Sequence, residues 1–445
     1  MNKHDKKNNV SRRTFVKNSA LIGGSLVAMP FASRAGYFTS VDDTIKIALI
    51  GCGGRGTGAA MQALKTKQNV KLVAMADAFR DRLDSSYTAL TSVDEEGVTV
   101  KDRVAVTEET KFVGFNAYLD AIALADVVIL ATPPGFRPIH FEEAIKQGKH
   151  VFMEKPVATD PAGVKRVLDT AQIAKQKKLN VVVGLQRHYQ NSYRELYKRV
   201  KDGMIGDITS GQVWWNNDGV WVNLRQPGQT EMEYQMRNWY YFNWLCGDHI
   251  VEQHIHNLDV MNWFKGGYPV QAQGMGGRQV RTGKEYGEIF DHHYVEYQYA
   301  DGTILNSQCR HIKGTYAKVD EMIVGTKGVV KCGAGDMVNK GSSVYKFDIT
   351  KENNPYQSEH DELFAALAKR DYKFADAENG AKATLTAIIG RLATYSGQVI
   401  EWDKTLNSGL NIQPMSYDWN ANPPTLPNVD GFYPVAVPGV TKYFV

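Results

Sequence analysis

The chain has 445 residues, 43% of them hydrophobic and 22% charged, which is the composition of a globular protein long enough for two domains. The formal net charge is +4, but the first 35 residues hold seven Lys or Arg and one Asp, so the remainder is net negative. This distribution does not favour a basic surface for nucleic acid, and no nucleic-acid partner is predicted.

The first 35 residues have the pattern of an export signal peptide. Residues 11–17 (Ser-Arg-Arg-Thr-Phe-Val-Lys) are close to the twin-arginine consensus, a mildly apolar run covers residues 20–32, and residues 32–35 supply a cleavage site. The run is too short and too interrupted by glycine to span a membrane. We expect a periplasmic protein, exported by the twin-arginine route, with no membrane anchor. The alternative is a basic amphipathic N-terminus that stays attached.

Residues 44–187 alternate short apolar runs with segments of helical period. The runs are mostly β-branched and apolar at successive positions, as in parallel strands covered on both faces. The segments between them are predicted to be crossover helices, which gives a doubly wound α/β domain. Residues 91–115 are less regular and are expected to contain the third strand. The other predicted strands are Ile45–Ile50, Leu72–Ala76, Val127–Ala131, Val151–Met153 and Val181–Leu185.

Residues 188–400 predict a second domain of a different kind. Trp, Tyr and Gly are frequent, and runs such as residues 293–299 alternate in polarity, which indicates an α+β domain with an open, mainly antiparallel sheet. Helical period returns at residues 359–368 and 381–395. Residues 401–445 are predicted to be a C-terminal tail packing on the surface.

A glycine-rich segment follows the first predicted strand and opens a helix. Residues 51–56 (Gly-Cys-Gly-Gly-Arg-Gly) fit GxGxxG, in which glycines let backbone N–H groups approach a pyrophosphate at a helix N-terminus. A tight turn is the alternative for such a loop alone, but an acid also ends the next strand, placed to bind a ribose hydroxyl. We therefore predict a Rossmann dinucleotide site. Its assigned residues are Gly51, Gly53, Gly54, Arg55, Gly56 and Asp77.

The acid at the end of the second strand favours NAD over NADP. A carboxylate at Asp77 repels a 2′-phosphate, so NADP is the less favoured cofactor. Arg80 is the residue that opposes this interpretation, because its guanidinium could pair with a phosphate. We interpret Arg80 instead as a solvated charge on a helix.

Three further segments, together with the glycine loop, resemble one family. They are residues 131–134 (Ala-Thr-Pro-Pro) with His140, residues 154–156 (Glu-Lys-Pro), and residues 247–259, which contain acid-x3-His-x2-Asp. Over roughly residues 44–400 the chain resembles the glucose–fructose oxidoreductase/inositol dehydrogenase (Gfo/Idh/MocA) family. The resemblance implies a two-domain oxidoreductase. The cofactor site is accordingly extended to Thr132, Pro133, His140, Glu154 and Lys155.

The resemblance implies that Lys155 is catalytic and that an acid, a histidine and an aspartate face the nicotinamide from one helix. The acid is Glu252, where the family usually has Asp, and His256 and Asp259 follow it. Their i, i+4, i+7 spacing predicts one face of a continuous helix. Oxidising a secondary alcohol needs a base for the hydroxyl proton and a cation for the developing alkoxide. We predict Lys155, His256 and Glu252 as the catalytic set, with His256 as base, and Asp259 as a substrate contact.

Residues 186–189 (Gln-Arg-His-Tyr) follow the sixth strand, at the edge where open α/β sheets bind ligands. The resemblance places this segment beside substrate and nicotinamide, so Arg187 and Tyr189 are predicted substrate contacts. Aromatic side chains gather in the second domain and can stack on sugar faces, with core packing as the alternative for most of them. They are Trp214, Trp215, Trp221, Trp239, Tyr240, Tyr241 and Trp244.

Three histidines between residues 249 and 256 raise the alternative of a metal site. His249 and His254 are five residues apart and His254 and His256 are two apart, so neither pair shares a helix face. A zinc site would need a non-helical backbone or ligands such as His292 and His293. No metal is predicted.

Three activities remain open on these residues. The favoured one is hydride transfer to or from a secondary alcohol of a sugar or glycoside, and the second is a redox-neutral glycosidase or lyase acting through a 3-keto sugar. The third, a binding protein without turnover, is disfavoured by Lys155 and His256. Outside the cytoplasm we expect no free NAD(H) pool, so the NAD is expected to be tightly bound and the hydride returned to the sugar, a second sugar or an electron acceptor. A carbohydrate substrate and a homo-oligomer are expected.

Overall fold

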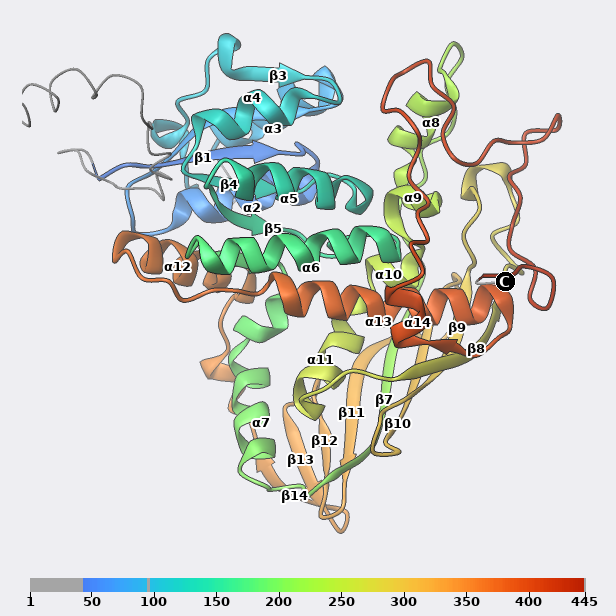
Figure 1. Ribbon diagram of the computed structural model, residues 1–445. Helices are drawn as coiled ribbons and strands as arrows, with labels where there is room; N and C mark the ends of the chain where they lie inside the picture. Colours follow the sequence, from blue (N-terminus) through green and yellow to red (C-terminus); the bar gives the residue numbers. More distant parts are fainter. Residues whose placement is uncertain (1–42, 94–96, 444–445) are drawn as a thin grey trace, which may run out of the picture.

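The computed structural model describes residues 43–93 and 97–443, and its ribbon is shown in Figure 1. The predicted export signal lies outside the described residues. Two sheets organise the chain: one carries the glycine-rich loop, and the other forms the base of the second domain.

The first sheet has six strands in the order β3-β2-β1-β4-β5-β6, and every adjacent pair is parallel. Its strands are short and almost wholly buried, because helices cover both faces. The prediction of a doubly wound domain is confirmed, with the third strand inside residues 91–115. The strands are β1 (Ile45–Ile50), β2 (Val70–Asp77), β3 (Lys111–Val113), β4 (Val127–Leu130), β5 (His150–Met153) and β6 (Val181–Val183).

Helices connect the strands of this sheet. The clearest start is that of α6, where Pro161 is the first residue and the Asp160 carboxylate accepts a hydrogen bond from Gly163 N at 2.6 Å. The helices of this layer are α2 (Gly54–Lys65), α3 (Arg80–Thr91), α4 (Ala117–Leu124), α5 (Arg137–Lys146) and α6 (Pro161–Gln176).

The second sheet has nine strands in the order β14-β13-β12-β11-β7-β10-β9-β8-β15. Within the described residues β7 and β10 pair in parallel and the other adjacent pairs are antiparallel, which confirms the prediction of an open, mainly antiparallel sheet. The strands are β7 (Ile208–Asn217), β8 (Gln271–Gly277), β9 (His292–Gln298), β10 (Ile304–His311), β11 (Lys318–Gly325), β12 (Val329–Lys331), β13 (Asp336–Asn339), β14 (Ser342–Lys346) and β15 (Ile400–Glu401).

Helices cover one side of this sheet and connect it to the first. Figure 1 shows α13 lying between the two sheets, with α6 on one side of it and β8 on the other. Almost every residue of α13 is buried, since both of its faces are covered. The helices of this part are α7 (Asn191–Lys201), α8 (Glu231–Arg237), α9 (Asn243–Cys246), α10 (His249–Glu252), α11 (Ile255–Lys265), α12 (Pro355–Ala368), α13 (Ala377–Ser396) and α14 (Trp402–Leu406).

Two segments near the end of the chain, one before α13 and one after α14, contact the first domain. Helix α12 packs against α2, the helix of the glycine-rich loop. The tail after α14 has no described helix or strand, and its Gln413 donates hydrogen bonds to Thr159 Oγ1 and Trp244 O. The cofactor domain is therefore supported by residues from the end of the chain. Among the described helices, none is both long and apolar enough to cross a membrane.

Candidate active site

The glycine-rich loop has the geometry of a pyrophosphate cradle. Gly51 has φ +96°, and a Cβ at Gly56 would lie 1.9 Å from the Gly51 carbonyl oxygen, so both positions require glycine. Cβ atoms at Gly53 and Gly54 would meet nothing within 4 Å, so the loop is open on that side. Helix α2 begins there with no side-chain cap, which leaves N–H groups free to bind an anion. The loop therefore fits a dinucleotide.

Asp77 ends β2 beside this loop. Its Oδ2 accepts a hydrogen bond from Cys52 N at 2.6 Å and its Oδ1 accepts one from Phe79 N at 2.9 Å. Burial raises the pKa of Asp77, while these two N–H groups and the charge of Arg82 act to lower it. Each carboxylate oxygen keeps a lone pair for a ribose hydroxyl, which is the role predicted for this residue.

A cavity of about 420 Å³ runs along the carboxyl edge of the parallel sheet. It brings together most of the predicted cofactor residues, whereas Gly56, Glu154 and Lys155 are not among those that line it. The predicted residues on its wall are Gly51, Gly53, Gly54, Arg55, Asp77, Thr132, Pro133 and His140.

The opposite wall of this cavity comes from the second domain. Trp221, Arg237 and Trp239 line it, and Arg237 stacks over the Phe79 ring at 4.0 Å. The C-terminal tail packs behind the first-domain side of the cavity. Trp419 contacts Phe79, which lines the cavity, at 5.1 Å between ring centroids. Sequence reasoning assigned none of these residues to the cofactor, because a contact between distant segments leaves no local pattern.

The two arginines of α3 have different surroundings. Arg80 binds Asp84 at 2.8 Å and Glu108 at 2.6 Å, which agrees with its interpretation as a surface charge. Arg82 lines the cavity close enough to influence Asp77. Arg82 is thus a cation on the cavity wall whose charge reaches Asp77, and it was not singled out in the sequence.

Lys155 follows β5 and reaches into the second domain. Its Nζ donates to the Glu252 carbonyl oxygen at 2.6 Å and to Glu252 Oε1 at 3.0 Å, and both side chains are mostly buried. The Lys155–Pro156 peptide is cis. The structure therefore joins two of the three predicted catalytic residues in one ion pair.

The prediction of one continuous helix carrying Glu252, His256 and Asp259 is wrong. Glu252 ends α10, and His256 and Asp259 belong to α11, which starts at Ile255 after a turn. The interruption lets Glu252 present both its carbonyl and its carboxylate to Lys155, because a carbonyl inside a helix is already engaged.

His256 lies beside Lys155 in a nearly sealed position. Its ring is 6% exposed and stacks on Trp215 with 5.9 Å between centroids. Nδ1 has no hydrogen-bond partner in the described part of the chain. Burial, with the charges of Lys155 and Arg187, lowers the pKa of His256 well below its usual range. The imidazole is therefore neutral and able to accept a proton.

Three predicted substrate residues are held by partners in the protein. Asp259 Oδ2 contacts His188 Nε2 at 2.7 Å, and although burial lowers the pKa of His188, the Asp259 charge raises it above its usual value. Arg187 pairs with buried Glu321. Tyr189 is buried, and its hydroxyl donates to Asp376 at 3.0 Å. Their contact with substrate stays a prediction.

Glu154 belongs to a charged cluster behind the cofactor loop. Arg55 Nε donates to Glu154 Oε1 at 2.6 Å, which links the start of α2 to the end of β5. Glu359 of α12 is fully buried nearby, and neither of its carboxyl oxygens has a partner among the described residues. Burial and the charge of Glu154 raise the pKa of Glu359 well above its usual range. The sequence marked Glu359 only as part of a helix.

Comparison with known families identifies the architecture. Residues 45–185 match the model of the oxidoreductase family with an NAD-binding Rossmann fold, and residues 193–331 match the GFO/IDH/MocA C-terminal domain. Together the two matches cover more than half of the chain. The chain belongs to the Gfo/Idh/MocA family. The resemblance inferred from its motifs is confirmed, and this Gfo/Idh/MocA protein is an NAD-binding oxidoreductase.

Characterised relatives of this Gfo/Idh/MocA protein are distant. Inositol 2-dehydrogenase of Rhizobium meliloti (strain 1021) is 23% identical over 340 residues, 73% of this chain and 89% of the relative. A 2,7-anhydro-N-acetylneuraminate hydratase of Mediterraneibacter gnavus is 24% identical over 307 residues, 68% of this chain and 70% of the relative.

Solved structures share the fold. Scyllo-inositol dehydrogenase from Lactobacillus casei with bound NAD(H) and scyllo-inositol has a TM-score of 0.59 at 22% identity, covering 81% of this chain and 99% of that one. Aldose-aldose oxidoreductase from Caulobacter crescentus has a TM-score of 0.62 at 18% identity, covering 80% of this chain and 99% of that one.

We expect the Asp77→Ala variant to bind NAD more weakly by roughly 1.5–3 kcal/mol, because a charge-assisted hydrogen bond to a ribose hydroxyl is lost. Its preference for NAD over NADP should narrow, since the repulsion of a 2′-phosphate is lost as well. Calorimetric titration of cofactor-free protein with each dinucleotide measures both effects. Asp84→Ala is the control, because Asp84 is an exposed acid of the next helix. Unchanged affinity of Asp77→Ala for both dinucleotides would assign Asp77 a purely structural role.

Proposed function

We propose that this protein is an exported oxidoreductase that retains NAD and transfers hydride between it and a secondary alcohol of a sugar or glycoside. The observation that carries the proposal is the Lys155 ammonium group, fixed by Glu252 at the carboxyl edge of the sheet beside neutral His256. Inositol dehydrogenases among the relatives support a polyhydroxylated substrate.

The Lys155–Glu252 contact leaves one donor for substrate. An ammonium group has three N–H donors, and Glu252 accepts two of them, through its carbonyl and its carboxylate. No other partner of Lys155 is present among the described residues, so the third N–H can bind the substrate oxygen. Its charge stabilises the alkoxide that develops as the hydroxyl loses its proton.

His256 is placed to receive the hydroxyl proton. Its low pKa keeps the ring unprotonated. Its Nδ1 is sealed inside the protein, so the substrate proton would have to reach Nε2. Stacking on Trp215 fixes the plane of the ring. When bound, the nicotinamide supplies the hydride acceptor or donor. His256 takes up the proton, and Lys155 stabilises the charge on oxygen.

Retention of the cofactor is supported by the construction of its cavity. Walls come from the first domain and from the segment holding Trp221 and Trp239, and the tail packs behind Phe79 through Trp419. Release would require several of these segments to separate. A retained cofactor has to be regenerated in place, so we propose that the hydride returns to a second sugar, to an electron acceptor or to the same sugar.

A redox-neutral lyase or hydratase is the second candidate, and the similarity to 2,7-anhydro-N-acetylneuraminate hydratases favours it. Such a route would oxidise C3, remove the proton on C2, eliminate the substituent and return the hydride. It needs a further base. His188, paired with Asp259 and partly exposed, is the group in the site best suited to that role.

Incubation with aryl glycosides in deuterated water, with and without an electron acceptor, separates the two candidates. A dehydrogenase forms a keto sugar only with acceptor, keeps the glycosidic bond and need not exchange C2–H. We expect this result. Aglycone release with deuterium at C2 and no need for acceptor would instead establish the elimination route. Nuclear magnetic resonance of the products reports both outcomes.

Lys155→Met and His256→Ala should each lower kcat by about 10²–10⁴-fold, because each removes a group that acts on the hydroxyl proton or the oxygen charge. Their NAD content should stay unchanged. Lys165→Met is the matched control, since Lys165 is an exposed lysine on α6. In the unmodified protein, the acid limb of kcat/KM should lie below the ordinary histidine pKa of about 6.5, because the base must be neutral. An acid limb at or above that value would argue against His256.

Localisation is part of the proposal. The twin-arginine pattern of residues 11–17 supports export of a folded protein that already holds its cofactor. Replacing Arg12 and Arg13 together by Lys should leave the protein in the cytoplasm with its NAD and fold intact. The control variant Lys17→Arg should still be exported. Fractionation and immunoblotting measure the distribution. Periplasmic protein from the double variant would contradict this route.

We also propose a homo-oligomer. On the second sheet, the face that carries Trp214, Met275 and Tyr294 stays exposed or half-exposed in the single chain, and the Met275 side chain is 71% exposed. Aromatic and methionine side chains are enriched at protein interfaces, so this mixed face suits a second copy of the same sheet. Light scattering of the purified protein gives the number of chains.

A further inference from the structure

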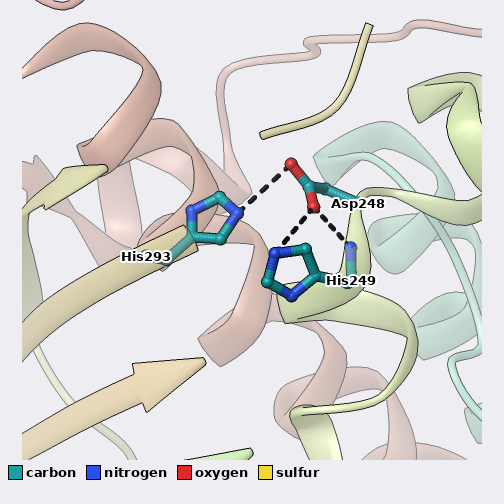
Figure 2. Close-up of side chains that lie close together, drawn as sticks. All are labelled: Asp248, His249 and His293. Atoms are coloured by element: carbon teal, nitrogen blue, oxygen red, sulfur yellow. Dashed lines mark hydrogen bonds and ion pairs between the residues drawn. The ribbon is translucent and has the colours of Figure 1, made fainter. Parts of the chain in front are cut away.

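A buried group of side chains lies one helical turn before Glu252. Figure 2 shows the Asp248 carboxylate between the His249 and His293 imidazoles, from the start of α10 and from β9. All three side chains have 0% exposure, and one donor atom from each lies within 4.8 Å of the others. The group takes no part in binding NAD or in moving the substrate proton.

The backbone N–H of His249 donates to Asp248 Oδ1, whereas its ring nitrogens lack a hydrogen-bond partner in the described chain. Neither Nδ1 nor Nε2 has a hydrogen bond in the described part of the chain, although Nε2 is 3.8 Å from Asp248 Oδ1. Burial, with the neighbouring His311 and His293, lowers the pKa of His249 well below its usual range. A neutral imidazole keeps one lone pair, and a buried polar atom without a partner destabilises the fold.

His293 lies between Thr394 and Asp248. Its Nδ1 is 2.8 Å from the Thr394 hydroxyl oxygen. Its Nε2 is 3.2 Å from Asp248 Oδ2 without hydrogen-bond alignment. A cation between Nε2 and the Asp248 carboxylate would bind both.

Asp248 is held rigidly in this position. Its φ is +73°, a backbone conformation rare for residues other than glycine, and its Oδ2 accepts hydrogen bonds from Tyr395 Oη at 2.6 Å and Phe290 N at 3.0 Å. These contacts fix the carboxylate in the way that outer partners fix metal ligands.

We propose that Asp248, His249 and His293 bind a zinc ion that is built into the fold. Two neutral imidazoles and one carboxylate form a zinc ligand set, with donors about 2.0–2.2 Å from the metal and therefore about 3.3 Å apart. Small rotations of the two rings, by about 1–1.5 Å at the nitrogens, bring the three donors to that spacing. Because the group is sealed, the ion enters during folding.

The ion would position catalytic machinery rather than act on substrate. His249 is the first residue of α10 and Glu252 is the last, so a metal at His249 anchors the short helix that holds Lys155. The sequence prediction of no metal site is thereby revised. It considered His292 and His293 only as remote ligands, and it did not include Asp248.

The test begins with tag-free protein as purified, measured by inductively coupled plasma mass spectrometry. We expect about one zinc per chain. Protein unfolded with chelator should refold to a higher Tm with zinc chloride than without it. Refolding with cobalt chloride should give visible absorption from cobalt bound by these ligands. These readouts do not depend on turnover. The zinc proposal can therefore fail while the proposed oxidoreductase activity is confirmed, and the activity can fail while zinc binding is confirmed.

Variants locate the ion. His249→Ala and His293→Ala should lose the zinc, whereas His292→Ala should keep it, because the neighbouring His292 side chain is 39% exposed and pairs with Asp291. If the first two variants fail to fold, the zinc content and cobalt spectrum of the unmodified protein decide alone. Absence of zinc both as purified and after refolding with zinc chloride would overturn the proposal in favour of a metal-free Asp248–His293 ion pair.

Discussion

The contact between the Lys155 ammonium group and Glu252 is the interaction on which the site depends. Lys155 leaves the end of β5 in the first domain, and Glu252 ends α10 in the second, so this ion pair joins the two domains where the substrate would bind. A mostly buried lysine needs a counter-charge, and a carboxylate from the other domain supplies it. This contact thus fixes the position of Lys155 relative to the second domain.

Segments far apart in sequence support that contact from both sides. Helix α13 fills the space between the two sheets, α12 packs against the glycine-loop helix, and the C-terminal tail packs behind the cofactor cavity. Behind Glu252, the group formed by Asp248, His249 and His293 fixes the start of α10. The cofactor cavity and Lys155 are therefore held by segments from several parts of the chain rather than by the Rossmann domain alone.

Much of the first domain and of the cofactor cavity was predictable from sequence, because both depend on local sequence patterns. Buried parallel strands leave apolar runs, and the glycine loop with Asp77 has fixed spacing, so the first sheet and most of the cofactor wall were found. The break between α10 and α11 was not found, because the i, i+4, i+7 spacing of Glu252, His256 and Asp259 indicates one helix, and the Lys155 contact with the Glu252 carbonyl at the break comes from a distant segment. The sequence did not indicate that Trp221 and Trp239 line the cavity, or that Trp419 packs behind Phe79. These contacts join segments that are distant in sequence.

The central proposal is that this oxidoreductase keeps its NAD as a resident group, in a cavity that residues of both domains line and that the tail contacts through Phe79. The most direct measurement is to denature the purified protein, without added cofactor, and quantify the released dinucleotide by absorbance and mass spectrometry. The account predicts close to one NAD or NADH per chain and little NADP. Release of no dinucleotide, together with no binding of NAD at micromolar concentrations, would contradict it.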